Sequence, residues 1–174
     1  MKFARLLFCL SVIAVFSLAA FGQQRKRNAE NFTAVTMSGH TVQLDSLRGK
    51  VVVMTFWTTR CNACHHVIPK LNRLTEQYRG QDVVFLGITT DNAAKVQNYL
   101  KKTRFDFSIL PDQFGVLLKY AGRDVAGNVD MVFPTHFLVN QNGEIEFRTS
   151  GFDKVKQLDS GINQLLSTPQ ARVE

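Results

Sequence analysis

Hydrophobic residues along the chain alternate between two patterns that predict different structures. Two apolar runs, residues 51–56 and 83–88, have the length and the β-branched composition of buried strands. Apolar residues then recur at helical spacing through residues 61–80 and 91–102. Strands that alternate with helices in this way imply a right-handed crossover and parallel central strands, as in an α/β domain.

The later part of the chain predicts shorter elements. Residues 105–110 indicate a short extended piece, and residues 111–120 indicate a helix. Residues 134–139 and 144–148 indicate sequential strands, because the Asn-Gly turn between them is a strong hairpin signal. Residues 155–166 predict the closing helix.

Two further stretches differ from this order. Residues 32–42 alternate around Ser38-Gly39 and predict a β-hairpin, with a tight connection over residues 44–50 into the first buried strand. Residues 121–132 show no clear periodicity, so we predict an irregular loop there. Such a loop either helps to select a partner or is an ordinary surface insertion.

The N-terminal residues have the pattern of a targeting segment. Lys2 and Arg5 precede an apolar stretch over residues 6–18, and Ala20-Phe21-Gly22 provides a small-x-small cleavage site. An uncleaved membrane anchor is the alternative, because the apolar run is near the lower length limit of a spanning helix and a basic triplet follows the cut. We therefore divide the chain into a signal peptide or membrane anchor at 1–22, a basic linker at 23–31 and one domain at 32–170.

Charge and cysteine content narrow the classes of function. The 174 residues carry a formal net charge of +7, and no basic stripe interleaves with aromatic residues. We therefore expect no nucleic acid partner and only a mild preference for acidic partners or anionic lipid headgroups. Of the three cysteines, Cys9 lies in the leader, which leaves Cys61 and Cys64 and excludes a stabilising disulfide framework.

Cys61 and Cys64 stand where the first buried strand passes into the following helix. Unpaired N–H groups and the positive end of the macrodipole at a helix N-terminus favour an anion, and Arg60 adds a cation. That environment lowers a cysteine pKa from its free value of about 8.5, so we expect Cys61 to be the attacking thiolate. Cys64 lies one turn further in, where it can resolve a mixed disulfide, so the two residues form a redox-active disulfide.

The sequence FWTTRCNAC at residues 56–64 resembles the active site of the thioredoxin superfamily. The Gly-containing hairpin, the Leu-x-x-Leu-Arg-Gly-Lys connection and the strand ending in Phe-Trp resemble TlpA-like and ResA-like proteins, the exported branch. This resemblance implies a thioredoxin fold of the α/β class, with a central mixed sheet flanked by helices and an extra N-terminal β-hairpin. The chain departs from the family pattern at Ala63, where most relatives carry proline, and at Arg60.

The same resemblance implies further site residues. The superfamily carries a cis-proline before a strand and packs it against the dithiol, and the matching residue here is Pro134. The backbone of the preceding Phe133 would then pair with an extended substrate segment. We therefore assign Pro134 to the catalytic set, and Trp57, Arg60 and Phe133 to substrate binding.

Proton handling departs from the pattern of the family. Thr55 and Val67 occupy positions at which relatives often carry a carboxylate. Asp91, just past the second buried strand, falls near another acidic position of ResA-like proteins, and we predict it as the catalytic base for the Cys64 thiol. Its alternative role is the N-cap of the next helix. His65 either tunes the thiolate or is a partly exposed residue without a catalytic role.

The resemblance implies a thiol-disulfide oxidoreductase in the periplasm or another extracytoplasmic place. It favours a reductase of exported client proteins, such as apocytochrome c, that receives electrons from a membrane-linked donor, although the dithiol alone supports either direction. The N-terminal segment would serve as a membrane tether if it is not cleaved. We expect no cofactor and no metal site.

Three other interpretations fit parts of the sequence. Residues 61–65 match Cys-x-x-Cys-His, the haem attachment motif, although a small c-type cytochrome needs neither the preceding strand nor the Phe133-Pro134 pair. Thr58 precedes Cys61 as in the peroxiredoxin Pro-x-x-x-Thr-x-x-Cys motif, but Met54 takes the place of the proline. A thioredoxin-fold binding module with an incidental dithiol is the non-enzymatic alternative.

Overall fold

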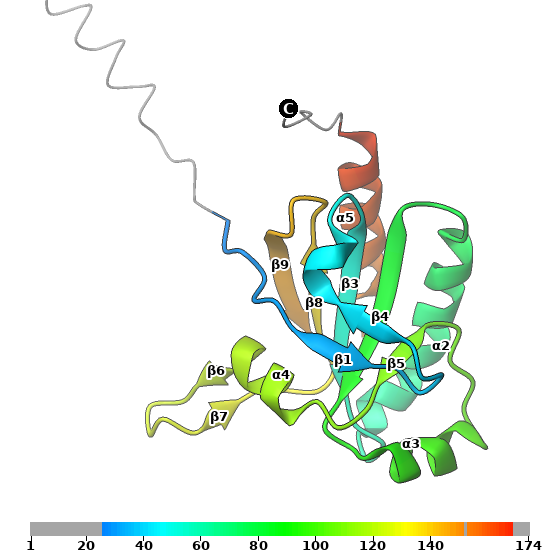
Figure 1. Cartoon of the computed structure of the whole chain (residues 1–174), viewed down its shortest axis with the longest axis vertical. Coiled ribbons are helices and arrows are strands. Elements are labelled where there is room, and N and C mark those ends of the chain that lie inside the picture. The colour runs from blue at the N-terminus through cyan, green and yellow to red at the C-terminus, as the bar shows by residue number, and fades with distance from the viewer. Residues whose placement is uncertain (1–25, 152, 169–174) are drawn as a thin grey trace, which may run out of the picture.

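The computed structural model describes residues 26–151 and 153–168, which fold around one five-stranded mixed sheet. Its strands are β3 (Val51–Trp57), β4 (Val83–Thr89), β5 (Ser108–Leu110), β8 (Thr135–Val139) and β9 (Ile145–Ser150). β3, β4 and β5 are parallel, whereas β8 is antiparallel to β3 and β9 is antiparallel to β8. The order β5-β4-β3-β8-β9 places β3 at the centre of the sheet (Figure 1).

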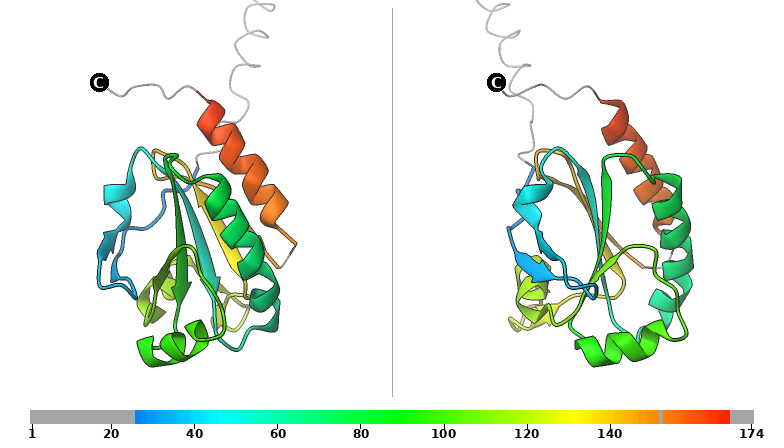
Figure 2. Two further views of the ribbon diagram at one scale, coloured as in Figure 1. Left: turned by 90° about the vertical axis from the view of Figure 1, so that its right-hand side faces the viewer. Right: turned by 45° about the vertical axis from the view of Figure 1, so that its right-hand side comes forward.

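Helices flank this sheet, as the α/β interpretation predicts. The helices are α2 (Asn62–Gln77), α3 (Ala93–Leu100), α4 (Phe114–Tyr120) and α5 (Val155–Ser167). α2 and α5 lie side by side on one face, which the second view of the ribbon shows clearly (Figure 2). α4 packs on the opposite face, and α3 lies near the end of the sheet where β3 finishes.

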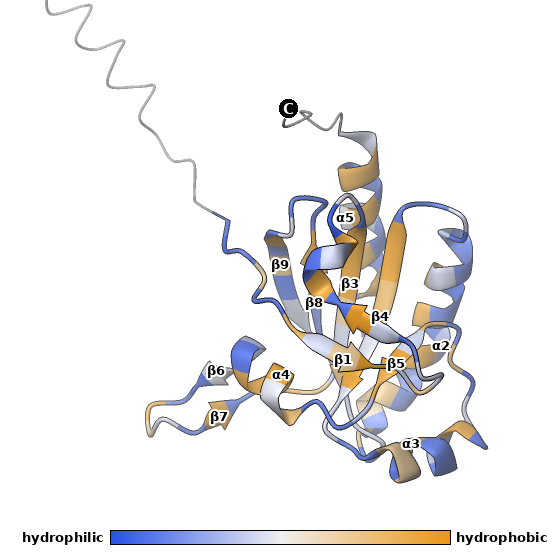
Figure 3. Ribbon diagram, viewed as in Figure 1, coloured by the Kyte–Doolittle hydropathy of each residue, from blue (hydrophilic) through white to orange (hydrophobic). Residues whose placement is uncertain are grey.

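The central strand β3 is buried along its whole length, and its side chains alternate between the two faces. Val51 and Val53 pack against α2 and α5. Val52, Met54 and Phe56 pack in the core cluster on the face of α4. A strand that is covered on both faces has no polar side, which explains the continuous apolar run in the sequence and the hydrophobic centre of the domain (Figure 3).

The N-terminal hairpin predicted for residues 32–42 is confirmed. β1 (Thr33–Val35) and β2 (Thr41–Gln43) pair antiparallel, and the turn between them contains Gly39 with a φ of 84°. A 3-10 helix, Leu44–Leu47, then leads toward β3.

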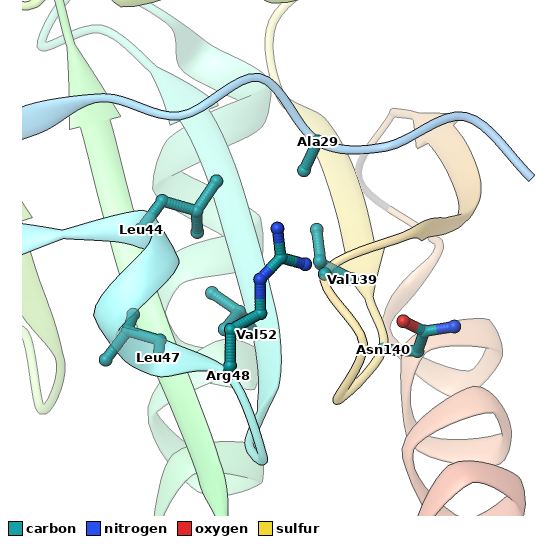
Figure 4. Close-up of a pocket in the computed structure, with 8 residues that line it drawn as sticks. Ala29, Leu44, Leu47, Arg48, Val52, Val139 and Asn140 are labelled. Carbon is teal, nitrogen blue, oxygen red and sulfur yellow. The ribbon is translucent and has the colours of Figure 1, made fainter. Parts of the chain in front are cut away.

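Arg48, in the connection into β3, holds that connection against the turn between β8 and β9. Its guanidinium donates to the carbonyl oxygen of Asn142, in the turn between β8 and β9, and forms an ion pair with Asp45 at 3.0 Å. Figure 4 shows this side chain lying between Leu47 and Val139. The space left beside it is about 10 Å³, room for at most a single water molecule, so this pocket holds no ligand site.

The folded domain begins before the predicted boundary at residue 32. Asn28 forms a β-bridge with Glu144, and the Ala29 N–H donates to the Gly143 carbonyl at 2.9 Å. Ala29 is buried in the core, and Lys26 pairs with Glu146 at 2.7 Å. The described part of the predicted basic linker therefore lies against the sheet.

The predicted signal peptide or anchor, residues 1–22, lies outside the described residues. Within residues 26–151 and 153–168, no helix has both the length and the apolar character needed to span a bilayer.

Two predicted helix starts are wrong by two or three residues. α4 begins at Phe114 rather than at residue 111, because the Asp112 and Gln113 N–H groups donate to the carbonyls of Asp91 and Thr89 and so hold that segment against the end of β4. α3 begins at Ala93, and Asn92 is its N-cap because the Asn92 side chain accepts the Lys95 N–H. The N-cap role considered for Asp91 is therefore wrong.

Residues 121–132 were predicted to be an irregular loop, and this prediction is wrong. β6 (Gly122–Arg123) and β7 (Val129–Asp130) form a small antiparallel hairpin that projects from the body beside α4 (Figure 1). Its turn is closed by the Asp124 carboxylate, which accepts the N–H groups of Ala126 and Asn128 at 2.9 and 2.8 Å. Side-chain hydrogen bonds of this kind carry no hydrophobic period, so the sequence pattern did not reveal the hairpin.

Candidate active site

Cys61 and Cys64 occupy the predicted strand-to-helix position. Cys61 is the N-cap of α2, and its Sγ accepts the Cys64 backbone N–H at 3.1 Å. The two residues form a disulfide, with Cα atoms 5.2 Å apart. Cys61 is partly exposed, whereas Cys64 is completely buried. A sulfur atom from another molecule can therefore reach Cys61 but not Cys64.

The loop before Cys61 is held from two sides at Thr59. Its N–H donates to Asp91 Oδ2 at 2.7 Å, and its carbonyl accepts from His65 Nε2 at 3.1 Å. Asp91 is only 7% exposed, and its own N–H donates to Thr89 Oγ1. Asp91 therefore ties the end of β4 to the cysteine loop, an anchoring role that the sequence did not suggest.

His65 belongs to the same clamp. Its imidazole donates from Nε2 to the Thr59 carbonyl, and its ring lies 5.3 Å from the ring of Tyr99 on α3. The side chain is otherwise exposed. The contacts of His65 are thus those of a loop support.

Trp57 lies inside the protein, beneath the site. It is 1% exposed, and its ring is covered by Phe105 at 4.8 Å and Tyr99 at 5.4 Å. Gly87 on β4 permits this packing, because a Cβ there would approach Trp57 Nε1 to 3.2 Å. Substrate contact was predicted for Trp57, but its burial makes it a support for the loop rather than a surface for a client.

The cis bond expected at Pro134 is present, whereas the catalytic role of Pro134 and the client contact of Phe133 stay predictions. The Phe133–Pro134 peptide bond is cis, and Pro134 is buried. Phe133 is half-buried and, like Cys61, packs against the buried cluster that contains Cys64. The Thr135 hydroxyl, which donates to the Val132 carbonyl, closes the start of β8.

A buried histidine was missed at the sequence level. His136 on β8 is opposite Thr55 on β3, and its Nδ1 lies 2.9 Å from Thr55 Oγ1. Its Nε2 has no hydrogen-bond partner among the described residues. Burial lowers the pKa of His136 to about 4, which the Gly151 backbone only partly offsets, so the ring is neutral at pH 7. Thr55 stands where relatives often carry a carboxylate, and this departure is the sequence feature that could have pointed to a polar partner such as His136.

Arg60, the possible metal ligands and the haem-attachment motif are the remaining features that the sequence raised. Arg60 is exposed, and among the described residues it has no hydrogen-bond or ion-pair partner, so its role toward a client stays a prediction. In the described part of the chain, no group of three or more His, Cys, Asp or Glu side chains is placed to hold a metal ion. Because Cys61 and Cys64 are bonded to each other in an α/β fold, the haem-attachment interpretation does not fit.

Comparisons with known proteins agree with this site. Residues 26–148 match the model of the AhpC/TSA family. Thiol-disulfide oxidoreductase ResA of Bacillus cereus is 25% identical over 178 residues, which cover 95% of this chain and 99% of that protein.

Two solved structures are similar in fold. A thiol:disulfide interchange protein of the thioredoxin family from Chlorobium tepidum has a TM-score of 0.72 at 22% identity, covering 84% of this chain and 100% of that one. Peroxidoxin BcpB from Mycobacterium tuberculosis has a TM-score of 0.66 at 20% identity, covering 83% of this chain and 97% of that one. The predicted thioredoxin fold is therefore confirmed. Because the family model spans most of the chain and includes the disulfide, this chain belongs to the AhpC/TSA family and is a thiol-disulfide redox enzyme.

Proposed function

We propose that this protein is an exported reductase of particular protein disulfides, with apocytochrome c as one client class. The observation that carries the proposal is the asymmetry of the dithiol, in which Cys61 is partly exposed at the N-cap of α2 and Cys64 is buried. The leader-like residues 1–22 support export, and the resemblance to ResA-like proteins supports the reductive direction.

The reduced enzyme would act in two exchanges. The Cys61 thiolate attacks one sulfur of the client disulfide; the client S–S bond breaks, its other sulfur leaves as a thiolate, and a mixed disulfide forms on Cys61. Cys64 then loses its proton and attacks Cys61 Sγ, which releases the client as a dithiol and forms the Cys61–Cys64 disulfide. Two electrons have passed to the client, and a membrane-linked dithiol donor must return them to the enzyme.

The proposal assigns the proton of Cys64 to Asp91. This carboxylate is buried at the base of the cysteine loop, with Oδ2 fixed by the Thr59 N–H and Oδ1 3.9 Å from Lys95 Nζ. A positioned carboxylate can accept a proton during exchange. Arg60 and the backbone of Phe133 would contact the client on either side of Cys61.

A redox titration of the Cys61/Cys64 pair against glutathione tests the direction. We expect a potential below about −220 mV, in the range of reducing dithiols. A value near about −120 mV would identify a strong oxidant and overturn the reductive assignment.

A trapping experiment tests the roles of the two cysteines. Cys64→Ser removes the resolving thiol, so client proteins should accumulate as mixed disulfides on Cys61, visible as bands that disappear on reduction. Cys61→Ser is the matched control and should trap nothing. The protein is a binding module with an incidental dithiol if two results are found together: neither variant captures clients, and a variant with both Cys61 and Cys64 replaced by Ser still functions in the cell.

A thiol-dependent peroxidase is the second candidate, because the AhpC/TSA match and the peroxidoxin neighbour favour it. Two features argue against a peroxidase. Met54, at the position of the motif proline, is completely buried in β3, and Cys61 is paired with a cysteine three residues away. Measured turnover of hydrogen peroxide distinguishes the two functions. We expect no turnover above that of the Cys61→Ser variant.

A further inference from the structure

Exposed hydrophobic side chains gather on one part of this protein. Six large hydrophobic side chains are exposed among the described residues, and one of them, Val35 on β1, lines a hollow with Asp112 and Gln113. The other five belong to α4, to the β6–β7 hairpin and to the segment that follows; we call them the apolar surface: Phe114, Leu118, Val125, Val129 and Val132. α4 and the hairpin lie side by side in the views of Figures 1 and 2, and the tip of the hairpin is hydrophobic in Figure 3. Exposed apolar groups that gather in this way mark interaction sites.

The hairpin holds its part of the apolar surface in a preformed shape. Asp124 accepts the Asn128 N–H at 2.8 Å and the Asn128 side-chain amide at 3.0 Å, and Gly127 turns with a φ of 83°. Val125 at the tip is therefore held away from the body, where it is fully exposed. Holding a valine in water stabilises nothing within the isolated domain, whereas a preformed loop lowers the entropic cost of binding another molecule.

The apolar surface continues directly into the active site. β7 ends at Asp130, and the chain then passes through Val132 to Phe133 and the cis-Pro134. Val132 is 61% exposed, while Phe133, like Cys61, packs against the buried cluster that contains Cys64. The hairpin projects at the end of the sheet where β3 finishes and α2 begins (Figure 1). A molecule bound to Cys61 can therefore extend onto the hairpin.

Charge indicates the kind of partner. The stretch from Phe114 to Val132 contains two cations, Lys119 and Arg123, and two anions, Asp124 and Asp130, so it has no net charge within a chain of formal charge +7. Binding to nucleic acid or to anionic lipid needs clustered Lys and Arg. A neutral apolar surface with short, unpaired strand edges fits an extended polypeptide instead.

We propose that the apolar surface binds an extended segment of the client polypeptide, and that it selects clients whose disulfide is flanked by apolar residues. The proposal rests on the proposed function, because it needs a protein disulfide at Cys61. It names the substrate class of that site as unfolded or extended chain segments rather than small disulfides or polar surface loops.

The test compares two synthetic peptides that differ only around one cysteine. Each carries the cysteine as a mixed disulfide with glutathione, flanked by Val and Leu in one peptide and by Ser and Asn in the other. Reduced enzyme should release the apolar peptide about tenfold faster, the discrimination that a hydrophobic contact typically supplies. In the Phe114→Ser/Leu118→Ser and Val125→Ser/Val129→Ser variants this ratio should fall to about twofold or less.

Two controls separate the possible failures. Gln164→Ser, which changes an exposed side chain on α5, across the sheet from α4, should keep the tenfold ratio. Exchange with glutathione disulfide reports the dithiol alone, so its absence in the wild type would contradict the proposed function and not the docking role. An unchanged peptide ratio in both double variants would overturn the proposal. If those variants instead lose a dimer, or lose binding to phosphatidylglycerol vesicles, while the ratio stays the same, the apolar surface serves that other contact and the proposal is also overturned.

Discussion

The two sides of the Cys61–Cys64 disulfide are built in opposite ways. On one side, the rings of Trp57, Tyr99 and Phe105 cover one another beneath the cysteine loop. On the other side, α4 and the β6–β7 hairpin present Phe114, which is 59% exposed, and their other hydrophobic side chains to solvent. The first side is packed inside the protein, and the second carries the surface that we propose for the client.

This difference shows that aromatic and aliphatic residues serve two purposes near one site. Buried rings gain free energy from the area that they remove from water, so they stabilise the domain. Exposed rings contribute little to stability and become useful only when a partner covers them. Substitutions on the two sides should therefore separate stability from client selection.

The largest expected effect is a difference in stability between alanine substitutions on the two sides of the disulfide. Trp57→Ala should lower the free energy of unfolding by about 3–5 kcal/mol, because it leaves a cavity beneath the loop. Phe114→Ala should change it by less than about 0.5 kcal/mol, as exposed positions do. Urea unfolding of both variants provides the measurement. Equal losses for the two variants would show that the side of the hairpin is also part of the stabilising core.

A second test addresses the buried side through pH. The pKa of His136 is lowered by burial from 6.5 to about 4, so its contribution to stability is complete above pH 6.5 and is lost as the pH falls toward 4. The reason is that the unfolded chain binds the proton first. The loss should reach on the order of 3 kcal/mol near pH 4.

The free energy of unfolding, measured between pH 7 and pH 4, should fall more steeply for the wild type than for His136→Leu. If the His136→Leu and wild-type slopes coincide, the ring is not held neutral by burial.

Asp91, on the buried side, has both a structural contact with Thr59 and a proposed role in proton transfer. If Asp91 is the proposed proton acceptor, Asp91→Asn should slow disulfide exchange by about tenfold or more and shift its pH dependence. Stability should change little, since the amide oxygen of asparagine can still accept the Thr59 N–H. Asp91→Ala should in addition cost about 1–3 kcal/mol, because that N–H then lacks its partner. Rate profiles of wild type and Asp91→Asn that superimpose would leave Asp91 only its anchoring role.

The smallest effect is expected at the tip of the hairpin. Hydrogen bonds, chiefly from the Asn128 side chain, lower the pKa of Asp124, so its carboxylate should hold the turn closed until the pH falls below the usual range of an aspartate. Asp124→Ala should speed hydrogen exchange at the Ala126 and Asn128 amides without changing global unfolding. Asp130→Ala in the same hairpin is the matched control. Unchanged protection of the two amides in Asp124→Ala would mean that the backbone alone shapes the turn.

Much of the fold followed from local patterns. The buried run at residues 51–56 became β3, and the helical spacing after Cys61 became α2, because side-chain period and burial are properties of short segments. The N-terminal hairpin was also predictable, since its Gly39 turn is a local signal. The start of α4 was displaced because tertiary hydrogen bonds at the end of β4 hold Asp112 and Gln113. The start of α3 was displaced by a local effect, because Asn92 rather than Asp91 is its N-cap.

The sequence by itself determined where the two cysteines stand, at the passage from a buried strand to a helix, and with them the class of redox chemistry. Only the tertiary structure decided what surrounds them. Asp91 meets Thr59 across 32 residues and His136 meets Thr55 across 81, because the sheet brings the ends of β4 and β8 beside β3. The exposure of Phe114 depends on the face of α4 that packs on the sheet. Such pairings depend on strand register and helix orientation, which a single chain pattern does not encode.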